Sequence, residues 1–438
     1  MKHYYSMLIK IMVFSAIILF SKSAASATVK VSDINANEPI VPVTYQQILG
    51  KGMDVDWSKT SQGRKYYSEK VVKEFKKENI SHVRIRIKDD ISENLFDNLD
   101  KQIKDCLKNG MIPVIAYQAN AFKNSVTDED MELVINWWSK MAEHCKDYSY
   151  LLSFDLMIEC SDALNKAPDK LNELYEKLVA QIRKTNPNRI IMISPRVRSD
   201  AQYLKELDIP TDANGYLMAE WHFYASGPSK TNERKKWTTG TSKEKALITE
   251  KINLALKWQK ETGIPTWVGA WMAGDYNEGN TYTITEQVEF AHYMVTQLEK
   301  SKIPFAVNSD TKFYSREKNT WISSMIPLRK CIYSSYSSAV NDLLKNTSIL
   351  FANKSAVKKN KSLHINWKKA RYAQKYQIVV ATTKNMKVGK KVYNVKKNSL
   401  QLKNIHKKKK IYVKIRAVRT YKNKKIYSKY SRQKVFSL

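Results

Sequence analysis

Four side chains that could do acid–base or hydrogen-bonding chemistry stand at the ends of two apolar runs. Glu159 closes the first run, and Glu220, His222 and Tyr224 alternate with apolar residues in the second. If the runs are strands, alternation points Glu220, His222 and Tyr224 to one side, and the parity of Glu159 with Asp155 points it into the same interior. A carboxyl in that partly dry setting is expected to have a raised pKa, which suits a proton donor near neutral pH. The alternatives are a surface cap for Glu159 and a core histidine for His222.

A barrel of alternating strands and helices is the scaffold that would bring these residues together. The expected strands are Leu49–Val55, His82–Ile87, Ile112–Gln118, Leu151–Glu159, Arg189–Ser194, Tyr216–Tyr224, Thr266–Trp271 and Phe305–Asn308. The expected helices, with apolar residues at i, i+3 and i+4, are Tyr66–Lys77, Ile91–Asn109, Asp128–Cys145, Leu171–Thr185, Ala201–Leu207, Lys243–Thr262 and Ile284–Lys300. Strict alternation implies a parallel sheet, and eight strands can close a (β/α)8 TIM barrel. An open doubly wound sheet is disfavoured because no Gly-rich phosphate turn follows a strand. In such a barrel the site lies at the carboxyl ends of the strands.

The last part of the chain differs in charge and in pattern. The whole chain of 438 residues carries a formal charge of +33, but Asn341–Leu438 alone holds 29 Lys and Arg and a single acid, Asp342. Its apolar residues alternate with polar ones in short runs separated by turns, which predicts a small antiparallel β-sandwich. We therefore expect an α/β barrel followed by a small, strongly basic all-β domain.

Short motifs recur at the predicted strand ends. They are Leu49–Asp54 (LGKGMD), Val83–Arg86 (VRIR), Phe154–Cys160 (FDLMIEC), His222–Tyr224 (HFY) and Val268–Trp271 (VGAW). In order and placement this series resembles glycoside hydrolase family 5, the cellulase-type retaining barrels. The motifs of that family at these places read lGkGiN, vRiP, fElmNEP, H-x-Y and iGEfG.

The resemblance implies roles for individual residues. Glu159 falls on the general acid/base of the family, His222 and Tyr224 on groups that hydrogen-bond the sugar or the nucleophile, and Arg84 on a partner of a carboxylate. Ile158 and Cys160 replace the Asn and Pro of the family motif. The activity implied is hydrolysis of O-glycosidic bonds in a β-linked polysaccharide, of cellulase or mannanase type, without a cofactor.

Ala270 is the departure that matters most, because it stands where the family has its nucleophilic glutamate. Retaining hydrolysis uses two carboxyls about 5–5.5 Å apart, and a methyl group cannot attack. Either the chain binds glycan without cleaving it, as a binding or cell-surface adhesion protein, or another carboxylate has taken the role. Glu220 is the best substitute because it faces the lumen on the neighbouring strand; Asp310 and Asp275 are the others. An inverting geometry, with a more distant carboxylate activating water, is a further option.

Aromatic residues at strand ends favour a saccharide partner, because flat rings stack on sugar faces. They are Trp57, Trp237, Trp271, Tyr276, Tyr282 and Trp321. Covering of the barrel rim is the alternative. We expect Arg84, His222, Tyr224, Trp57, Trp271 and Asp310 to contact substrate. The scattered His, Asp and Cys residues do not form a metal-binding pattern, so no metal is expected.

The domain boundaries follow from these patterns. Residues 1–27 have the positive, apolar and small-residue regions of a cleaved export signal, so the protein is expected to be secreted or at the cell surface. We expect the barrel over 28–335, a linker over 336–355 and the basic domain over 356–438. The order of Trp367, Tyr376 and the run Tyr412–Val418 in the last domain resembles fibronectin type III.

The positive field of the basic domain has several possible partners. An anionic cell-wall polymer is expected rather than a specific nucleic acid, and a solvated surface without a partner is the alternative. Four cysteines are present. A bridge between Cys106 and Cys145 and ordinary buried thiols are both open.

Overall fold

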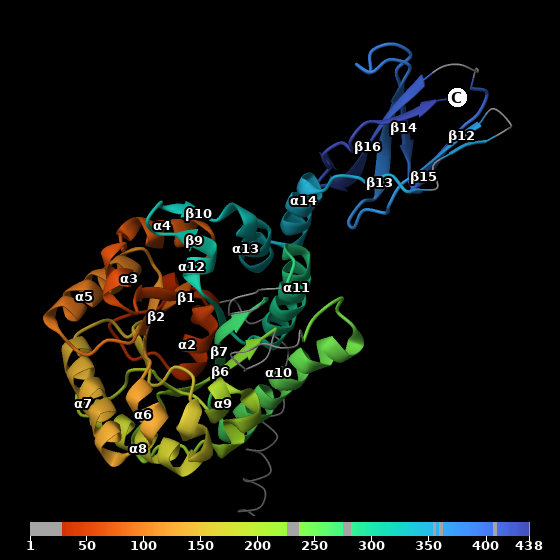
Figure 1. Cartoon of the computed structure of the whole chain (residues 1–438). Helices are drawn as coiled ribbons and strands as arrows, with labels where there is room; N and C mark the ends of the chain where they lie inside the picture. The colour runs from red at the N-terminus through yellow and green to blue at the C-terminus, as the bar shows by residue number, and fades with distance from the viewer. Residues whose placement is uncertain are drawn as a thin grey trace, which may run out of the picture.

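Eight parallel strands close a barrel in chain order in the computed structural model (Figure 1). The model describes residues 29–225, 236–274, 282–353, 356–358, 362–405 and 410–437. The strands are β1 (Lys51–Ser58), β2 (His82–Ile87), β3 (Ile112–Tyr117), β4 (Ser153–Asp155), β5 (Ile191–Ile193), β6 (Leu217–Tyr224), β7 (Thr266–Met272) and β8 (Phe305–Asn308). The predicted (β/α)8 barrel is confirmed.

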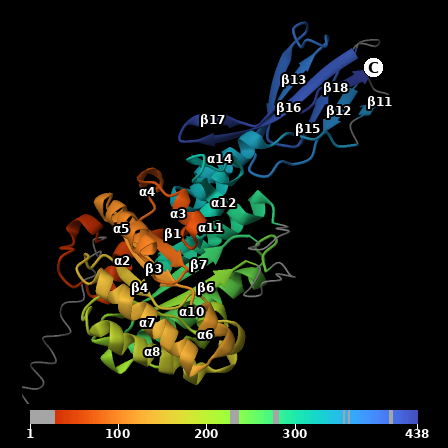
Figure 2. The same cartoon turned by 60° about the vertical axis from the view of Figure 1, so that its left-hand side comes forward.

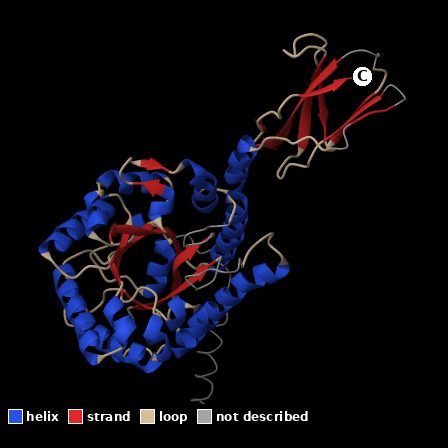
Figure 3. Ribbon diagram, in the orientation of Figure 1, coloured by secondary structure: helices blue, strands red, loops and turns tan. Residues whose placement is uncertain are grey.

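Helices surround the strands on the outside (Figure 3). The long ones are α4 (Glu69–Lys77), α5 (Glu93–Lys108), α7 (Asp128–Cys145), α8 (Pro168–Arg183), α10 (Ser242–Thr262) and α11 (Ile284–Ser301). Each was predicted to within a few residues, because each buries one apolar stripe against the strands. The segment predicted as a helix over Ala201–Leu207 is a 3₁₀ helix over Ala201–Glu206. The predicted strand Leu151–Glu159 forms ladder pairs only over Ser153–Asp155.

The barrel interior changes from apolar to charged along its axis. A lower layer, which includes Val114, Met218 and Trp267, packs on α2 (Pro42–Leu49). Above it lie Arg84 and Glu220, both fully buried. Isolated buried charges are costly, so such a layer persists only when its members pair with one another. The charged layer marks the floor of the candidate site.

The C-terminal domain is a pair of antiparallel sheets, as predicted. One sheet has the order β11-β12-β15 and the other the order β14-β13-β16-β17, with β18 also paired to β16. The bounds are β11 (Ala356–Lys358), β12 (Ser362–Asn366), β13 (Lys375–Ala381), β14 (Lys391–Val395), β15 (Ser399–Leu402), β16 (Lys410–Tyr421), β17 (Lys424–Tyr427) and β18 (Lys434–Ser437). Trp367, Ile378 and Ile415 lie in the core between the sheets.

A helix joins the two domains where the sequence predicted a linker (Figure 2). This helix, α14 (Tyr336–Asn346), is amphipathic: Leu343 packs into the barrel core and Leu344 into the core of the sheets. Glu289 of α11 fastens the junction, because its Oε1 accepts hydrogen bonds from Tyr336 Oη at 2.7 Å and from Tyr372 Oη at 2.5 Å.

The cysteines and the predicted export signal are the two remaining predictions about the chain. All four cysteines, Cys106 and Cys145 included, are buried free thiols. The predicted export signal over 1–27 lies outside the described residues. Within the described part of the chain, no helix combines the length and the apolar character needed to cross a membrane.

Candidate active site

Glu159 reaches the barrel mouth through a turn rather than through strand alternation. β4 ends at Asp155, and the backbone of Glu159 is left-handed, with φ of 53°. The ammonium of Lys123 holds this turn by donating to the carbonyl oxygen of Ile158 at 2.9 Å. The side chain of Glu159 is 22% exposed. Glu159 thus lies at the mouth, as expected, but the turn after β4 places it there and not the alternation of a strand.

Three side chains from two other elements hold the Glu159 carboxylate. Its Oε1 accepts from Tyr224 Oη at 2.8 Å and from His222 Nδ1 at 3.2 Å, and its Oε2 accepts from Arg198 Nη1 at 3.1 Å. Burial alone would raise the pKa of Glu159, but the hydrogen bond and charge of His222, with Tyr224 and Arg198, outweigh it and lower the pKa below its ordinary value. The expectation of a raised pKa is wrong. Glu159 is ionised at neutral pH and is poorly suited to give up a proton.

His222 lies between two carboxylates. Its Nε2 is 2.6 Å from Glu220 Oε1, while its Nδ1 faces Glu159. Burial lowers the pKa of His222, but the charge of Glu220 and the hydrogen bonds to both carboxylates raise it to about 9. The ring is therefore an imidazolium at neutral pH and donates on both sides.

Glu220 faces the lumen beneath this ring and is fully buried. Its Oε1 is also 2.6 Å from Arg84 Nη2, and the same guanidinium is 2.5 Å from Asp155 Oδ2. Arg84 is thus a partner of carboxylates. With the His222 ring between Glu220 and Glu159, no sugar atom can lie between the two carboxylates, as a retaining pair requires. Glu220 instead keeps His222 protonated and fixes the orientation of its ring.

Ala270, at the position that the motif resemblance assigns to the nucleophile, has its methyl group buried. It is the strand partner of His222, and it packs with Tyr224 and Met272. A bulge at Gly269 shifts the register of β7 here, since Trp221 pairs with Val268 but His222 pairs with Ala270. A Cβ at Gly269 would come within 1.8 Å of Glu220 Oε1, so the glycine makes room for that carboxylate.

The other residues expected to contact substrate are not brought to this cluster. Trp57 is buried and donates from Nε1 to Asp310 Oδ2 at 3.1 Å, and Asp310 is itself buried. Trp271 packs against Phe290 and Phe305 inside the wall. Trp237 and Tyr282 are buried as well, and the half-buried Trp321 stacks on Phe75. Asp275 and Tyr276 lie outside the described residues.

The sequence did not single out Arg198 or Asn308. Arg198 lies in α9 (Arg196–Ser199), a single turn in the loop after β5, within three consecutive left-handed residues, Val197–Ser199. Asn308 ends β8, donates to Tyr224 Oη at 3.2 Å and accepts from Arg86 at 3.3 Å. The rule that barrel sites form at strand ends could have found both, but no motif marks them.

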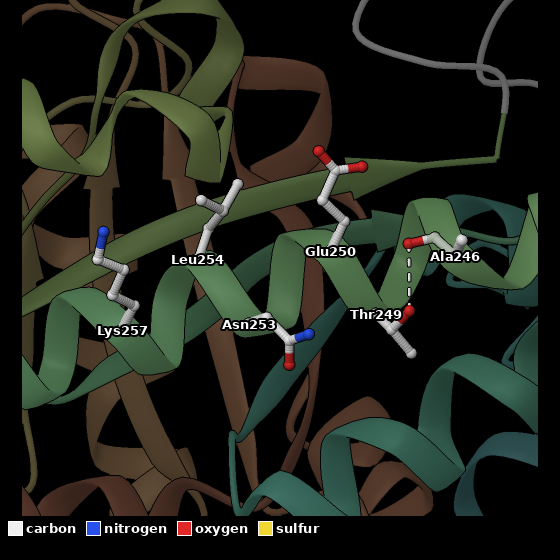
Figure 4. A pocket seen from close by; sticks show the side chains of 6 residues that line it. All are labelled: Ala246, Thr249, Glu250, Asn253, Leu254 and Lys257. Carbon is white, nitrogen blue, oxygen red and sulfur yellow. Dashed lines mark hydrogen bonds between the residues drawn. The ribbon is translucent and has the colours of Figure 1, made fainter.

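Two other features of the described residues stand apart from this site. They contain no group of three His, Cys, Asp or Glu side chains arranged to hold a metal ion. A hollow on the outer side of α10 (Figure 4) is bordered by that helix alone and contains none of the predicted site residues.

Comparison with known proteins shows the family of the barrel. The cellulase (glycosyl hydrolase family 5) model matches residues 44–309. The chain belongs to this family. Endoglucanase H of Acetivibrio thermocellus is 21% identical over 284 residues, which are 62% of this chain and 30% of that protein. The chain thus spans about a third of the length of the curated relative it matches.

Solved structures of endoglucanases share the fold of the barrel. Endoglucanase from Thermotoga maritima in complex with cellobiose has a TM-score of 0.58 at 21% identity, over 66% of this chain and 99% of that one. Its complex with mannotriose has a TM-score of 0.57 at 21% identity, with the same coverage. A cellulose synthase subunit from Clostridioides difficile has a TM-score of 0.55 at 19% identity, over 65% of this chain and 99% of that one.

Proposed function

We propose that this family 5 barrel binds a β-linked glucan or mannan at its mouth and lacks the nucleophile for retaining hydrolysis. Ala270 carries the proposal: a buried methyl group stands where the attacking carboxylate belongs. Double displacement cannot begin without a group that attacks the anomeric carbon.

The acid/base position supports the same conclusion. Glu159 is ion-paired to Arg198 and His222, so its carboxylate is stabilised in the form that cannot donate a proton. A carboxylate, an imidazolium and a tyrosine hydroxyl remain as hydrogen-bonding groups for sugar hydroxyls. Binding uses these groups as they stand, whereas hydrolysis requires a proton that Glu159 does not hold.

Hydrolysis of the same glycan is the second candidate function. The retention of Glu159 at the acid/base position, bonded to Tyr224 and His222, favours it. It would proceed by an inverting route, which needs a second carboxylate about 6.5–9.5 Å away to activate water. With either function, we also propose that residues 1–27 direct export and that the C-terminal domain is of the fibronectin type III kind.

Binding and turnover on neutral glycans separate the two functions. Cellohexaose and mannohexaose avoid attraction to the basic domain, so titration calorimetry with either reports on the barrel. Binding without release of reducing ends supports the first candidate. Turnover that falls by about 10²–10⁴ in Glu159→Gln supports the second, because the amide cannot donate a proton. Turnover undiminished in that variant would remove Glu159 from the mechanism, and no binding of either sugar would overturn both.

A further inference from the structure

One face of the C-terminal domain carries a row of basic and aromatic side chains. On β16 the side chains of Lys410, Tyr412, Lys414 and Arg416 alternate with the core residues and are half-buried or exposed. Alternate residues of a strand lie on one face, about 7 Å apart. The register places Val392 of β14 and Val435 of β18 on the same face, and both are exposed. We call this surface the β16 face.

Arg416 is already arranged at the centre of the β16 face. Its guanidinium lies 3.8 Å from the ring centroid of Tyr427 and 4.6 Å from that of Tyr430. Gln377 accepts from Arg416 Nε at 2.9 Å and from Tyr430 Oη at 3.2 Å. An arginine held in this way loses little side-chain entropy when it binds. Its Nε and Nη2 both donate to Gln377 Oε1, so the other edge of the guanidinium is the one that can donate to a carboxylate.

The domain offers these cations almost no partners of its own. No Asp or Glu follows Asp342 in the chain. Among the described residues, an ion pair from this domain reaches the barrel through Arg371 and Glu289, at 3.6 Å. The cations of the β16 face therefore depend on anions from outside the domain.

We propose that the β16 face binds an acidic polysaccharide, with Lys414 and Arg416 on its carboxylates and Tyr412, Tyr427 and Tyr430 beside its sugar rings. A sheet face with rings between cations suits an extended chain of charged pyranoses, since each sugar presents a carboxylate and an apolar face. A barrel of a glycoside hydrolase family in the same chain favours a polysaccharide over nucleic acid. The binding is independent of the neutral glycan site proposed for the barrel.

The test uses the full chain and polygalacturonate at low salt. The variant Lys414→Gln with Arg416→Gln removes two charges from the β16 face, and the control Lys387→Gln with Lys396→Gln removes two from exposed turns of the same domain. We expect Kd to rise at least about tenfold in the first and less than about twofold in the second, because only the first loses charge-assisted hydrogen bonds. Arg416→Lys keeps the charge but loses the stacked fork, so it should weaken binding measurably. Unchanged thermal unfolding shows that each variant is folded.

Several results would overturn the proposal. Equal losses in the two double variants would mean attraction by diffuse charge. Tighter binding of single-stranded DNA than of polygalacturonate at matched charge would indicate a nucleic-acid surface. Binding that does not weaken between low and physiological salt would exclude an ionic interface, because release of counterions makes such binding salt-dependent. Loss of cellohexaose binding in the β16-face variant would show that the two sites are not independent.

Discussion

At the scale of single residues, the site is a series of alternating charges in which each has a partner of opposite sign. Arg84, Glu220, His222 and Glu159 follow one another from the barrel floor to the mouth, each within ion-pair distance of the next. Arg198 closes the series at the surface. Because every charge is matched, the cluster is stable without the carboxylate that Ala270 lacks.

Restoring that carboxylate should restore hydrolysis. In Ala270→Glu the new side chain lies beside His222 and Tyr224 on a rigid strand, and its charge should raise the pKa of Glu159 toward that of a proton donor. We expect release of reducing ends from β-glucan or mannan to rise at least about a hundredfold over wild type.

Two controls accompany this substitution. Ala270→Gln, of the same size but without charge, should stay inactive. Activity already present in wild type and undiminished in Glu220→Gln would rule out Glu220 as a substitute nucleophile and would require another carboxylate.

The pKa of His222 predicts how barrel stability depends on pH. Because the folded-state pKa is raised from 6.5 to about 9, the ion pairs add stability that is fully present below about pH 6.5 and is lost as pH rises through 9. The free energy of unfolding should fall over this range by roughly 3 kcal/mol. Urea denaturation followed by tryptophan fluorescence at several pH values measures it. In His222→Gln the fall should be much reduced; an identical slope in that variant would assign it to other groups.

At the scale of elements, the bulge in β7 determines what the floor of the site can hold. It brings Ala270 level with His222 and leaves Gly269 against Glu220. A side chain at 269 and the Glu220 carboxylate cannot both fit. The ion pairs of Glu220 with Arg84 and His222 therefore require a glycine at this bulge.

Gly269→Ala should therefore be far more disruptive than its size suggests. The added methyl group displaces Glu220 from Arg84 and His222, and breaking a buried charge pair costs about 3–5 kcal/mol. Chemical denaturation measures the loss of stability. Gly215→Ala is the control for added bulk, because a Cβ there meets no atom within 4 Å, although its positive φ of 74° carries a strain of its own. Equal effects of the two substitutions would show that Glu220 does not depend on Gly269.

At the scale of the whole molecule, the contacts of one carboxylate hold a nearly neutral barrel against a strongly basic domain. Glu289 takes hydrogen bonds from Tyr336 of α14 and Tyr372 of the C-terminal domain, and its other oxygen is 3.6 Å from Arg371. Because one carboxylate serves all three, the orientation of the two domains depends heavily on it.

Glu289→Ala should loosen the domains without unfolding either. Small-angle scattering should show a larger radius of gyration and a broader distribution of interatomic distances. Glu299→Ala, also on α11, is the matched control: it removes an exposed carboxylate whose ion pair with the half-buried Lys51 lies within the barrel, and it should leave the scattering unchanged. A curve for Glu289→Ala that overlays wild type would show that packing of α14 alone holds the junction.

Periodicity and composition alone predict the barrel and the basic β domain, and the alanine at position 270 is read directly from the chain. The type of each element follows from the local spacing of its apolar residues. The identity of residue 270 does not depend on the fold. The fold was needed to show that Glu159 is ionised, that Glu220 lies out of reach beneath His222, and that Trp57 and Trp271 are buried in the wall. A pKa and an accessible surface depend on distances between groups far apart in the chain: Arg198 approaches Glu159 from the loop after β5, and His222 from β6. Periodicity predicts which way a side chain faces, but not what it meets there.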